Sequence, residues 1–217
     1  MKRGKPIGLL VLGVGLGLSA QCVLALPLQN GSFELPDISG TDATIPLSWS
    51  LAGAGPIQLV SPEFQPFGAP LAASNGSQWV DLTGQSEKLN QGLSQTFSTV
   101  AGGQYSLGFD VGNLDYSGYG RATVQLLIDN VVVGTYFNDI ANTGSGAMRW
   151  KSFIQGFTAA GAQTTVSFLG HAVEGNTSAQ VIGLDNVTVV PEPGAYGLAL
   201  AGVGVIAVGL HRRRRWV

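Results

Sequence analysis

Cysteine is nearly absent from this chain of 217 residues, and Cys22 is its single thiol. Residues 26–190 contain none, which excludes disulfides and thiolate chemistry from that part of the chain. Histidine is almost as scarce there, because His171 is the one histidine in the same range. A metal site built on two histidines is therefore excluded. The nucleophile elbow Gly-x-Ser-x-Gly is also missing, which removes one common hydrolase signature.

Basic residues are scarce in the same range. The cations there are Lys88, Arg121, Arg149 and Lys151. The same range contains twelve acidic residues, so its formal charge is −8, whereas the value for the whole chain is −2. Nucleic acid is a poor partner for such a segment, because that binding depends on neutralising phosphates. Divalent cations and neutral glycans are compatible with it.

Both ends of the chain have the pattern of targeting segments. The N-terminus has Lys2, Arg3 and Lys5, then an apolar stretch at 7–18 and the small-residue pattern Val23-Leu24-Ala25. This order predicts a signal peptide at residues 1–25 that is removed on export, with an uncleaved anchor as the alternative.

The C-terminus carries a proline break, an apolar run and an arginine cluster. The break consists of Pro191, Glu192 and Pro193, and residues 194–210 are 17 uncharged positions. As a helix this run would span about 25 Å, near the lower limit for crossing a bilayer. The chain then continues with Arg212, Arg213, Arg214 and Arg215. Such a cluster favours the cytoplasmic side, so we expect a transmembrane helix at 194–210.

Residues 26–190 have the pattern of one β-domain. Apolar and polar residues alternate at 104–111, as in a half-buried strand, and again at 164–169. Residues 122–128 and 131–137 flank Asp129-Asn130, which predicts a hairpin with a tight turn. A last strand is expected at 183–190, whereas Gly112-Asn113 and residues 142–146 are expected to be loops. The prediction is an all-β fold, an antiparallel β-sandwich.

The C-terminal segment, residues 191–217, resembles the PEP-CTERM sorting signal of Gram-negative bacteria, down to Pro191-Glu192-Pro193 itself. The resemblance implies that an exosortase recognises this motif and processes the tail. It also implies an intermediate anchored in the inner membrane, followed by release to the cell surface or the extracellular matrix.

The domain has its own resemblance, carried by strings near its start, middle and end. They are Asn30-Gly31-Ser32-Phe33-Glu34, Trp49, residues 95–107 and Leu184-Asp185-Asn186-Val187-Thr188-Val189. Residues 95–107 look like an edge strand, a glycine turn and a core strand. Together the strings resemble galactose-binding-like jelly-roll modules, which include carbohydrate-binding modules and related plant wall domains. The proline-rich stretch 56–70 departs from that pattern.

Glu34 and Asp185 form the candidate metal site. Modules of the resembling kind bring these two ends of the chain together and often hold a structural calcium there. Calcium takes six to eight hard oxygen ligands, which two carboxylates and loop carbonyls could supply. The alternative is that both residues accept hydrogen bonds from backbone N–H groups.

Aromatic residues provide the candidate glycan-binding site. Tyr116 and Tyr119 lie with Asp115 in a polar, glycine-rich string, where a core role is less natural. A tyrosine ring can pack against the C–H face of a sugar, and Asp115 can bond a hydroxyl. Trp79 is a further candidate, although a place in the core is the commoner use of a tryptophan beside a strand.

The sequence therefore favours an exported, non-catalytic surface or matrix protein associated with glycan. One alternative is a structural envelope or biofilm protein without a specific ligand. Another is a glycan hydrolase, because twelve acidic residues leave a carboxylate pair open.

Overall fold

The computed structural model describes residues 28–53, 55–68, 70–84, 89–115, 121–139, 144–171 and 181–192. The predicted signal peptide at 1–25, the expected helix at 194–210 and the arginines at 212–215 lie outside these residues. Among the residues that are described, no helix has the length and apolarity needed to cross a membrane.

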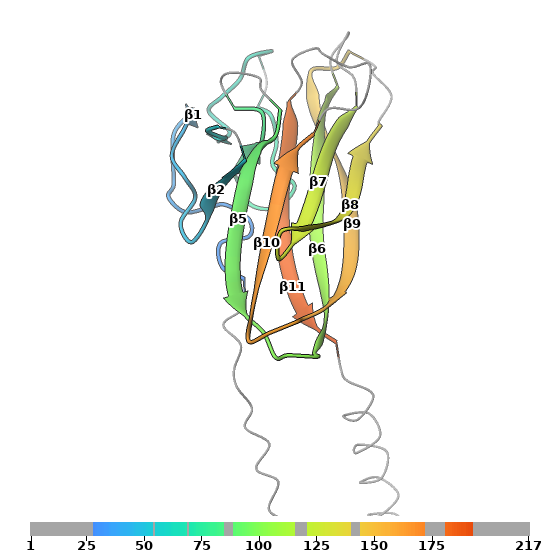
Figure 1. Cartoon of the computed structure of the whole chain (residues 1–217). Helices are drawn as coiled ribbons and strands as arrows, with labels where there is room; N and C mark the ends of the chain where they lie inside the picture. Colours follow the sequence, from blue (N-terminus) through green and yellow to red (C-terminus); the bar gives the residue numbers. More distant parts are fainter. Residues whose placement is uncertain are drawn as a thin grey trace, which may run out of the picture.

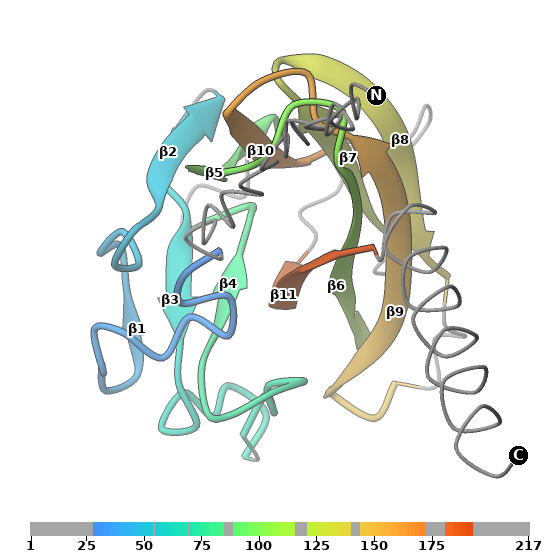
Figure 2. The same ribbon diagram turned by 90° about the horizontal axis from the view of Figure 1, so that it is seen from below.

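The described residues form two antiparallel sheets that face each other (Figures 1 and 2). The first sheet has the order β1 (Thr41–Asp42), β3 (Gln58–Val60), β4 (Trp79–Asp81), β11 (Ile182–Pro191), β6 (Gln104–Asp115) and β9 (Ala147–Thr158). The second has the order β2 (Ser50–Gly53), β5 (Gln91–Ser98), β10 (Gln163–Gly170), β7 (Ala122–Ile128) and β8 (Val131–Asn138). The predicted all-β, antiparallel β-sandwich is confirmed.

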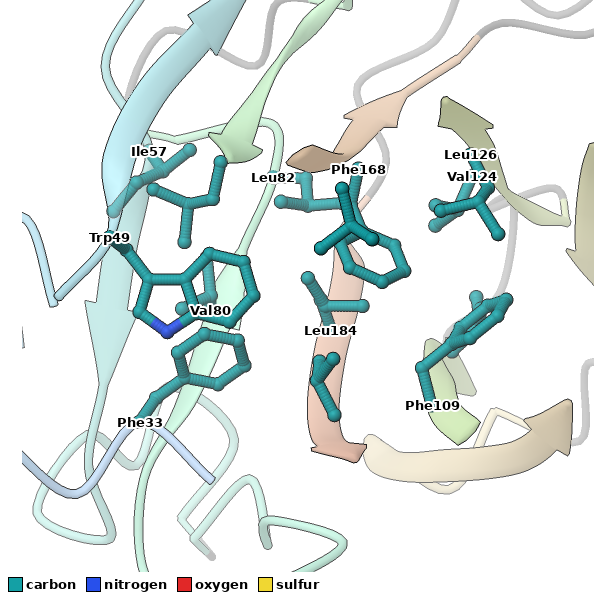
Figure 3. Close-up of a cluster of buried hydrophobic side chains, with 14 of the residues drawn as sticks. Phe33, Trp49, Ile57, Val80, Leu82, Phe109, Val124, Leu126, Phe168 and Leu184 are labelled. Atoms are coloured by element: carbon teal, nitrogen blue, oxygen red, sulfur yellow. The ribbon is translucent and has the colours of Figure 1, made fainter. Parts of the chain in front are cut away.

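The main core fills the space between the two sheets. Alternate residues of each strand point inward, so that Leu107 and Phe109 of β6 are buried together with Leu126 of β7 and Phe168 of β10. The Phe109 and Phe168 rings meet edge to face, with centroids 5.1 Å apart. Figure 3 shows Phe109, Leu126 and Phe168 converging from the two sheets, with Trp49 at one side of the cluster.

Several strands lie where the sequence predicted them, two of them from period-2 alternation. Residues 104–111 lie in β6, 164–169 in β10 and 183–190 in β11. The hairpin of β7 and β8 turns at Asp129 and Asn130, whose φ angles are 49° and 64°. Positive φ at both positions is the requirement of the tight turn that joins twisted strands, and Asp and Asn tolerate it.

The prediction of a loop at Gly112-Asn113 is wrong, because both residues lie inside β6. Met148 and Trp150 of β9 pack over Gly112, and a Cβ atom there would lie 2.5 Å from Met148 Cε. Glycine is therefore favoured by close packing within a strand rather than by a turn. Asn113 is buried and donates its side-chain N–H to the carbonyl of Asn138, 3.1 Å away.

Residues 95–98 belong to β5. Strand β10 pairs with them on one side, whereas β2 pairs only with residues 91–94 on the other, so this part of β5 is an edge as expected. Strand β2 lacks an alternating pattern, so its sequence did not predict it.

A second, smaller core lies on the outer side of the six-stranded sheet. It consists of Val60, Leu71, Trp79, Leu114 and Met148, with Phe64, Ala73, Trp150 and Val181 partly buried against it. The proline-rich stretch 56–70 leads into this cluster. This stretch therefore supplies part of the cover for one half of the outer face.

Candidate functional site

The last strand places Asp185 directly opposite Asp110 of β6. Both side chains are buried, at 0% and 3% exposure. The backbone N–H groups of Ser74 and Asn75 each donate to Asp185 Oδ2 over 2.8 Å. The Ser74 hydroxyl donates to Asp110 Oδ2 over 2.5 Å. The two aspartates therefore hold the start of the loop at residues 74–78, which we call the bracing loop.

Burial dominates the electrostatics of this pair. It raises the pKa of Asp185 to about 7, and the neighbouring Asp110 carboxylate adds to the rise. The backbone N–H groups that donate to Asp185 act in the opposite direction, because they favour the ionised form. Near neutral pH the side chain is therefore partly protonated.

Glu34 holds the other half of the bracing loop. Its Oε1 accepts hydrogen bonds from the N–H groups of Ser77 and Gln78, both at 2.9 Å. Gly76 directly precedes Ser77 at φ 72°, and a Cβ atom there would lie 2.4 Å from Glu34 Oε1. The structure thus brings Glu34 and Asp185 to one loop, as the resemblance implied.

The hydrogen bonds already use one oxygen of each carboxylate in the candidate calcium pair. Calcium needs lone pairs directed at the ion, whereas Asp185 Oδ2 and Glu34 Oε1 each accept two N–H groups of the bracing loop. In the parts of the chain that are described, no three acidic, histidine or cysteine side chains gather as a metal site would require. The calcium site stays a prediction, and the geometry favours the alternative of backbone acceptors.

Asp115 ends β6 and is buried at 3% exposure. Its carboxylate accepts the N–H of Gly144 at 3.0 Å and the Ser145 hydroxyl at 2.6 Å. Arg149 Nε lies 3.6 Å from the same carboxylate. Asp115 therefore fixes the segment before β9. Tyr116 and Tyr119 lie outside the described residues, so their role stays a prediction.

Trp79 is fully enclosed, with 1% of its surface exposed. Its indole N–H donates to the carbonyl of Leu71 at 2.9 Å, and Trp150 packs edge-on against its ring at a centroid distance of 5.8 Å. Protein atoms cover the ring, so Trp79 belongs to the second core and offers no face on which a sugar could stack.

The first two residues of the sorting motif are held against the sandwich. Pro191 is the last residue of β11 and pairs with Tyr105 of β6. The N–H of Glu192 donates to the Gln104 carbonyl at 2.8 Å, and the Ser106 hydroxyl donates to Glu192 Oε1 at 2.6 Å. Sequence reading missed this contact, although the strand pattern running straight into Pro191 was a signal for it. Pro193 lies outside the described residues.

The sorting motif and Asp115 lie at opposite ends of the sandwich. Strand β6, which is twelve residues long, begins beside Pro191 and ends at Asp115. An extended strand of that length spans about 35 Å. Figure 1 shows β11 ending where the turns from β5 to β6 and from β9 to β10 also lie.

Comparisons with solved structures agree with this architecture. The chain resembles the K1 cleaved adhesin domain of Lys-gingipain from Porphyromonas gingivalis W83, with a TM-score of 0.52 and 17% identity over 77% of this chain and 98% of that chain. A family 35 carbohydrate binding module from Clostridium thermocellum gives 0.42 and 11% over 67% and 99%. At these identities the likeness concerns the fold alone.

A cycloisomaltooligosaccharide glucanotransferase from Paenibacillus sp. is also similar, with a TM-score of 0.42 and 18% identity. The match covers 70% of this chain and 18% of that enzyme, so the chain spans a small part of its length.

Family models identify two regions of the sequence. A PEP-CTERM protein-sorting motif matches residues 189–215, which begin inside β11. No curated protein matches the sequence. The model described as "Protein of unknown function (DUF642)" matches residues 26–190, most of the chain, and the chain therefore belongs to the DUF642 family.

Proposed function

We propose that this protein is an exported, non-catalytic module of the cell surface or extracellular matrix that associates with glycan. In this proposal an exosortase recognises the PEP-CTERM motif and processes the tail of an intermediate held at the inner membrane. The observation that carries the proposal is the direct passage of β11 into Pro191 and Glu192, with no linker between the sandwich and the motif.

The direct continuation of β11 into the motif supports one orientation of the sandwich relative to the membrane. The motif end of the sandwich would face the membrane, and the end at Asp115 would face outward, about 35 Å away. Tyr116 and Tyr119 follow Asp115 in the sequence, so we propose them as glycan-stacking residues at the outward end. Because Asp115 already accepts hydrogen bonds from Gly144 and Ser145, we propose that it positions this end rather than contacting sugar.

A non-catalytic role is supported by the burial of the best acidic pair. Asp110 and Asp185 are directly opposite each other, but the exposed fractions of 3% and 0% leave no path for a substrate. Glycoside hydrolysis requires both carboxylates to flank the bond that is cleaved. This pair cannot do so without opening the sheet.

The glycan proposal is tested with the purified full-length chain on a panel of polysaccharides. Binding to one or more of them, without release of reducing sugar, is the expected result. Binding with release of reducing sugar would favour the hydrolase alternative. No binding to any polysaccharide would favour a structural protein without a specific ligand.

The sorting proposal is tested in cells that contain the exosortase. Replacing Pro191, Glu192 and Pro193 with alanine should leave the full-length chain in the inner-membrane fraction. Unchanged processing of this variant would contradict the role assigned to the motif.

A further inference from the structure

The rare cations of the domain gather at one place. Of the four cations in residues 26–190, Arg121, Arg149 and Lys151 lie around the β8–β9 edge of the sandwich, and Lys88 lies outside the described residues. Strands β8 and β9 run next to each other there, as Figures 1 and 2 both show. We call the group formed by Arg121, Phe137, Arg149 and Lys151 the cationic corner.

An aromatic ring organises two of these cations. The Arg121 guanidinium carbon lies 4.7 Å from the centroid of Phe137, and Lys151 Nζ lies 5.4 Å from the same centroid. Phe137 is 40% exposed, which is unusual for a phenylalanine in a strand. Cation–π attraction of this kind restrains a long side chain while leaving its N–H donors available to a ligand.

The charges in the cationic corner do not cancel. Arg149 lies 3.6 Å from the buried Asp115, and Lys151 lies 3.0 Å from the exposed Asp139. For Arg121, no salt bridge is found with any carboxylate in the described part of the chain. Three cations against two carboxylates leave one positive charge in excess, on a domain whose formal charge is −8.

We propose that the cationic corner binds a carboxylate group of an acidic polysaccharide. Arg121 would bond the carboxylate with its planar fork of N–H donors, and Lys151 would add a second cation. A single excess charge suits a polymer whose carboxylates are spaced along a sugar chain. A densely charged polyphosphate would be repelled by the surrounding acidic surface. This inference rests on the proposed glycan function and specifies its ligand class.

The test compares sodium alginate, a polyuronate, with its propylene glycol ester, which has the same backbone with many of its carboxylates blocked. Affinity electrophoresis of the full-length chain should show binding to alginate and weaker binding to the ester. The variant Arg121→Gln should bind alginate about tenfold more weakly, the effect of losing one charge-assisted hydrogen bond. Raising the salt concentration should weaken binding of the wild-type protein.

A gain-of-binding variant guards against misfolding as an explanation. Asp139→Asn removes the acid beside Lys151 and should strengthen alginate binding several-fold. Asp42→Asn removes an acid of the same kind from β1, at the opposite edge of the six-stranded sheet, and should not change it. Thermal melting of each variant shows that the fold is kept.

Three results would overturn the proposal: equal binding of alginate and its ester, unchanged binding by Arg121→Gln, or equally tight binding of double-stranded DNA. Binding to neutral polysaccharides that Arg121→Gln leaves intact would overturn this inference and leave the proposed function standing. An absence of binding to any polysaccharide would contradict the proposed function as well.

Discussion

Single carboxylates tie distant segments of this chain together. Glu34 and Asp185 accept N–H groups from the two halves of the bracing loop, and Asp115 accepts donors from Gly144 and Ser145. Where such a carboxylate is ionised, its hydrogen bonds belong to the stronger class. In a domain without cysteine, these acids supply the loop restraints that disulfides provide in many secreted proteins.

Substitutions at Glu34 separate a loop acceptor from a calcium ligand. Glutamine keeps an Oε1 atom that can accept both N–H groups, so Glu34→Gln should change the free energy of unfolding by less than about 1 kcal/mol. Glu34→Ala loses both hydrogen bonds and should destabilise by about 2 kcal/mol. Thermal melting of both variants with and without calcium measures these effects. A rise in melting temperature with calcium that Glu34→Gln or Asp185→Ala removes would instead support the ion.

Asp185 predicts a dependence of stability on pH. Its pKa is about 7 in the folded chain, against an ordinary value of 3.8 for an aspartate in the unfolded chain, so the folded chain binds the proton more tightly. The protonated Asp185 side chain therefore stabilises the fold below pH 4, and this stabilisation is lost as the pH rises toward 7. The loss is on the order of 4 kcal/mol, at about 1.4 kcal/mol per pKa unit. In Asp185→Asn, the free energy of unfolding should fall less steeply over this range.

A substitution of an exposed acid provides the control for that slope. Asp37→Asn changes an exposed carboxylate and should keep the wild-type dependence. Parallel slopes in wild type and Asp185→Asn would show that burial does not hold a proton on Asp185.

Among the strands, β11 connects the core to the sorting motif. It lies between β4 and β6 in the six-stranded sheet, carries Asp185 at its middle and ends at Pro191. The contact of Glu192 with Ser106 and Gln104 extends this strand by one residue. An enzyme that reads the motif in an extended active site must therefore release these last bonds.

Removing the Ser106 hydroxyl should make the motif easier to release. In Ser106→Ala, Glu192 loses one hydrogen bond of about 1 kcal/mol, so processing should accelerate by up to several-fold. Pulse-chase measurement of the processed fraction reads this out. Ser152→Ala, on the same face of the sheet in β9, is the matched control. Slower processing of Ser106→Ala than of Ser152→Ala would show that the enzyme needs the contact in place.

Over the whole molecule, sequence periodicity predicted the sandwich but not its exceptions. Strand β10 follows from its alternating pattern, and the β7–β8 hairpin follows from the turn residues Asp129-Asn130 between two apolar runs. Gly112 was misread because one sequence cannot distinguish a glycine that turns the chain from one that packs beneath Trp150. The cover of residues 60–73 over the outer face has no periodicity, so it becomes visible only in three dimensions.

The candidate sites were also predictable from the sequence only in part. The proximity of Glu34 and Asp185 could be predicted from family resemblance. Their roles could not, because the donors are backbone groups of residues 74–78, more than one hundred positions from Asp185. The clustering of Arg121 and Lys151 also depends on β8 and β9 closing one edge of the sandwich.

Glycan binding at the end of the sandwich opposite the sorting motif is the central claim, and one comparison tests it most directly. The full-length wild-type chain and a Tyr116→Ala, Tyr119→Ala variant are applied to the same polysaccharide panel, with Tyr136→Phe as a control in β8. The account predicts binding by wild type and the control, and loss of about tenfold or more in the double variant, since stacked aromatic rings contribute on the order of 1 kcal/mol each. Equal binding by the double variant and wild type would contradict it.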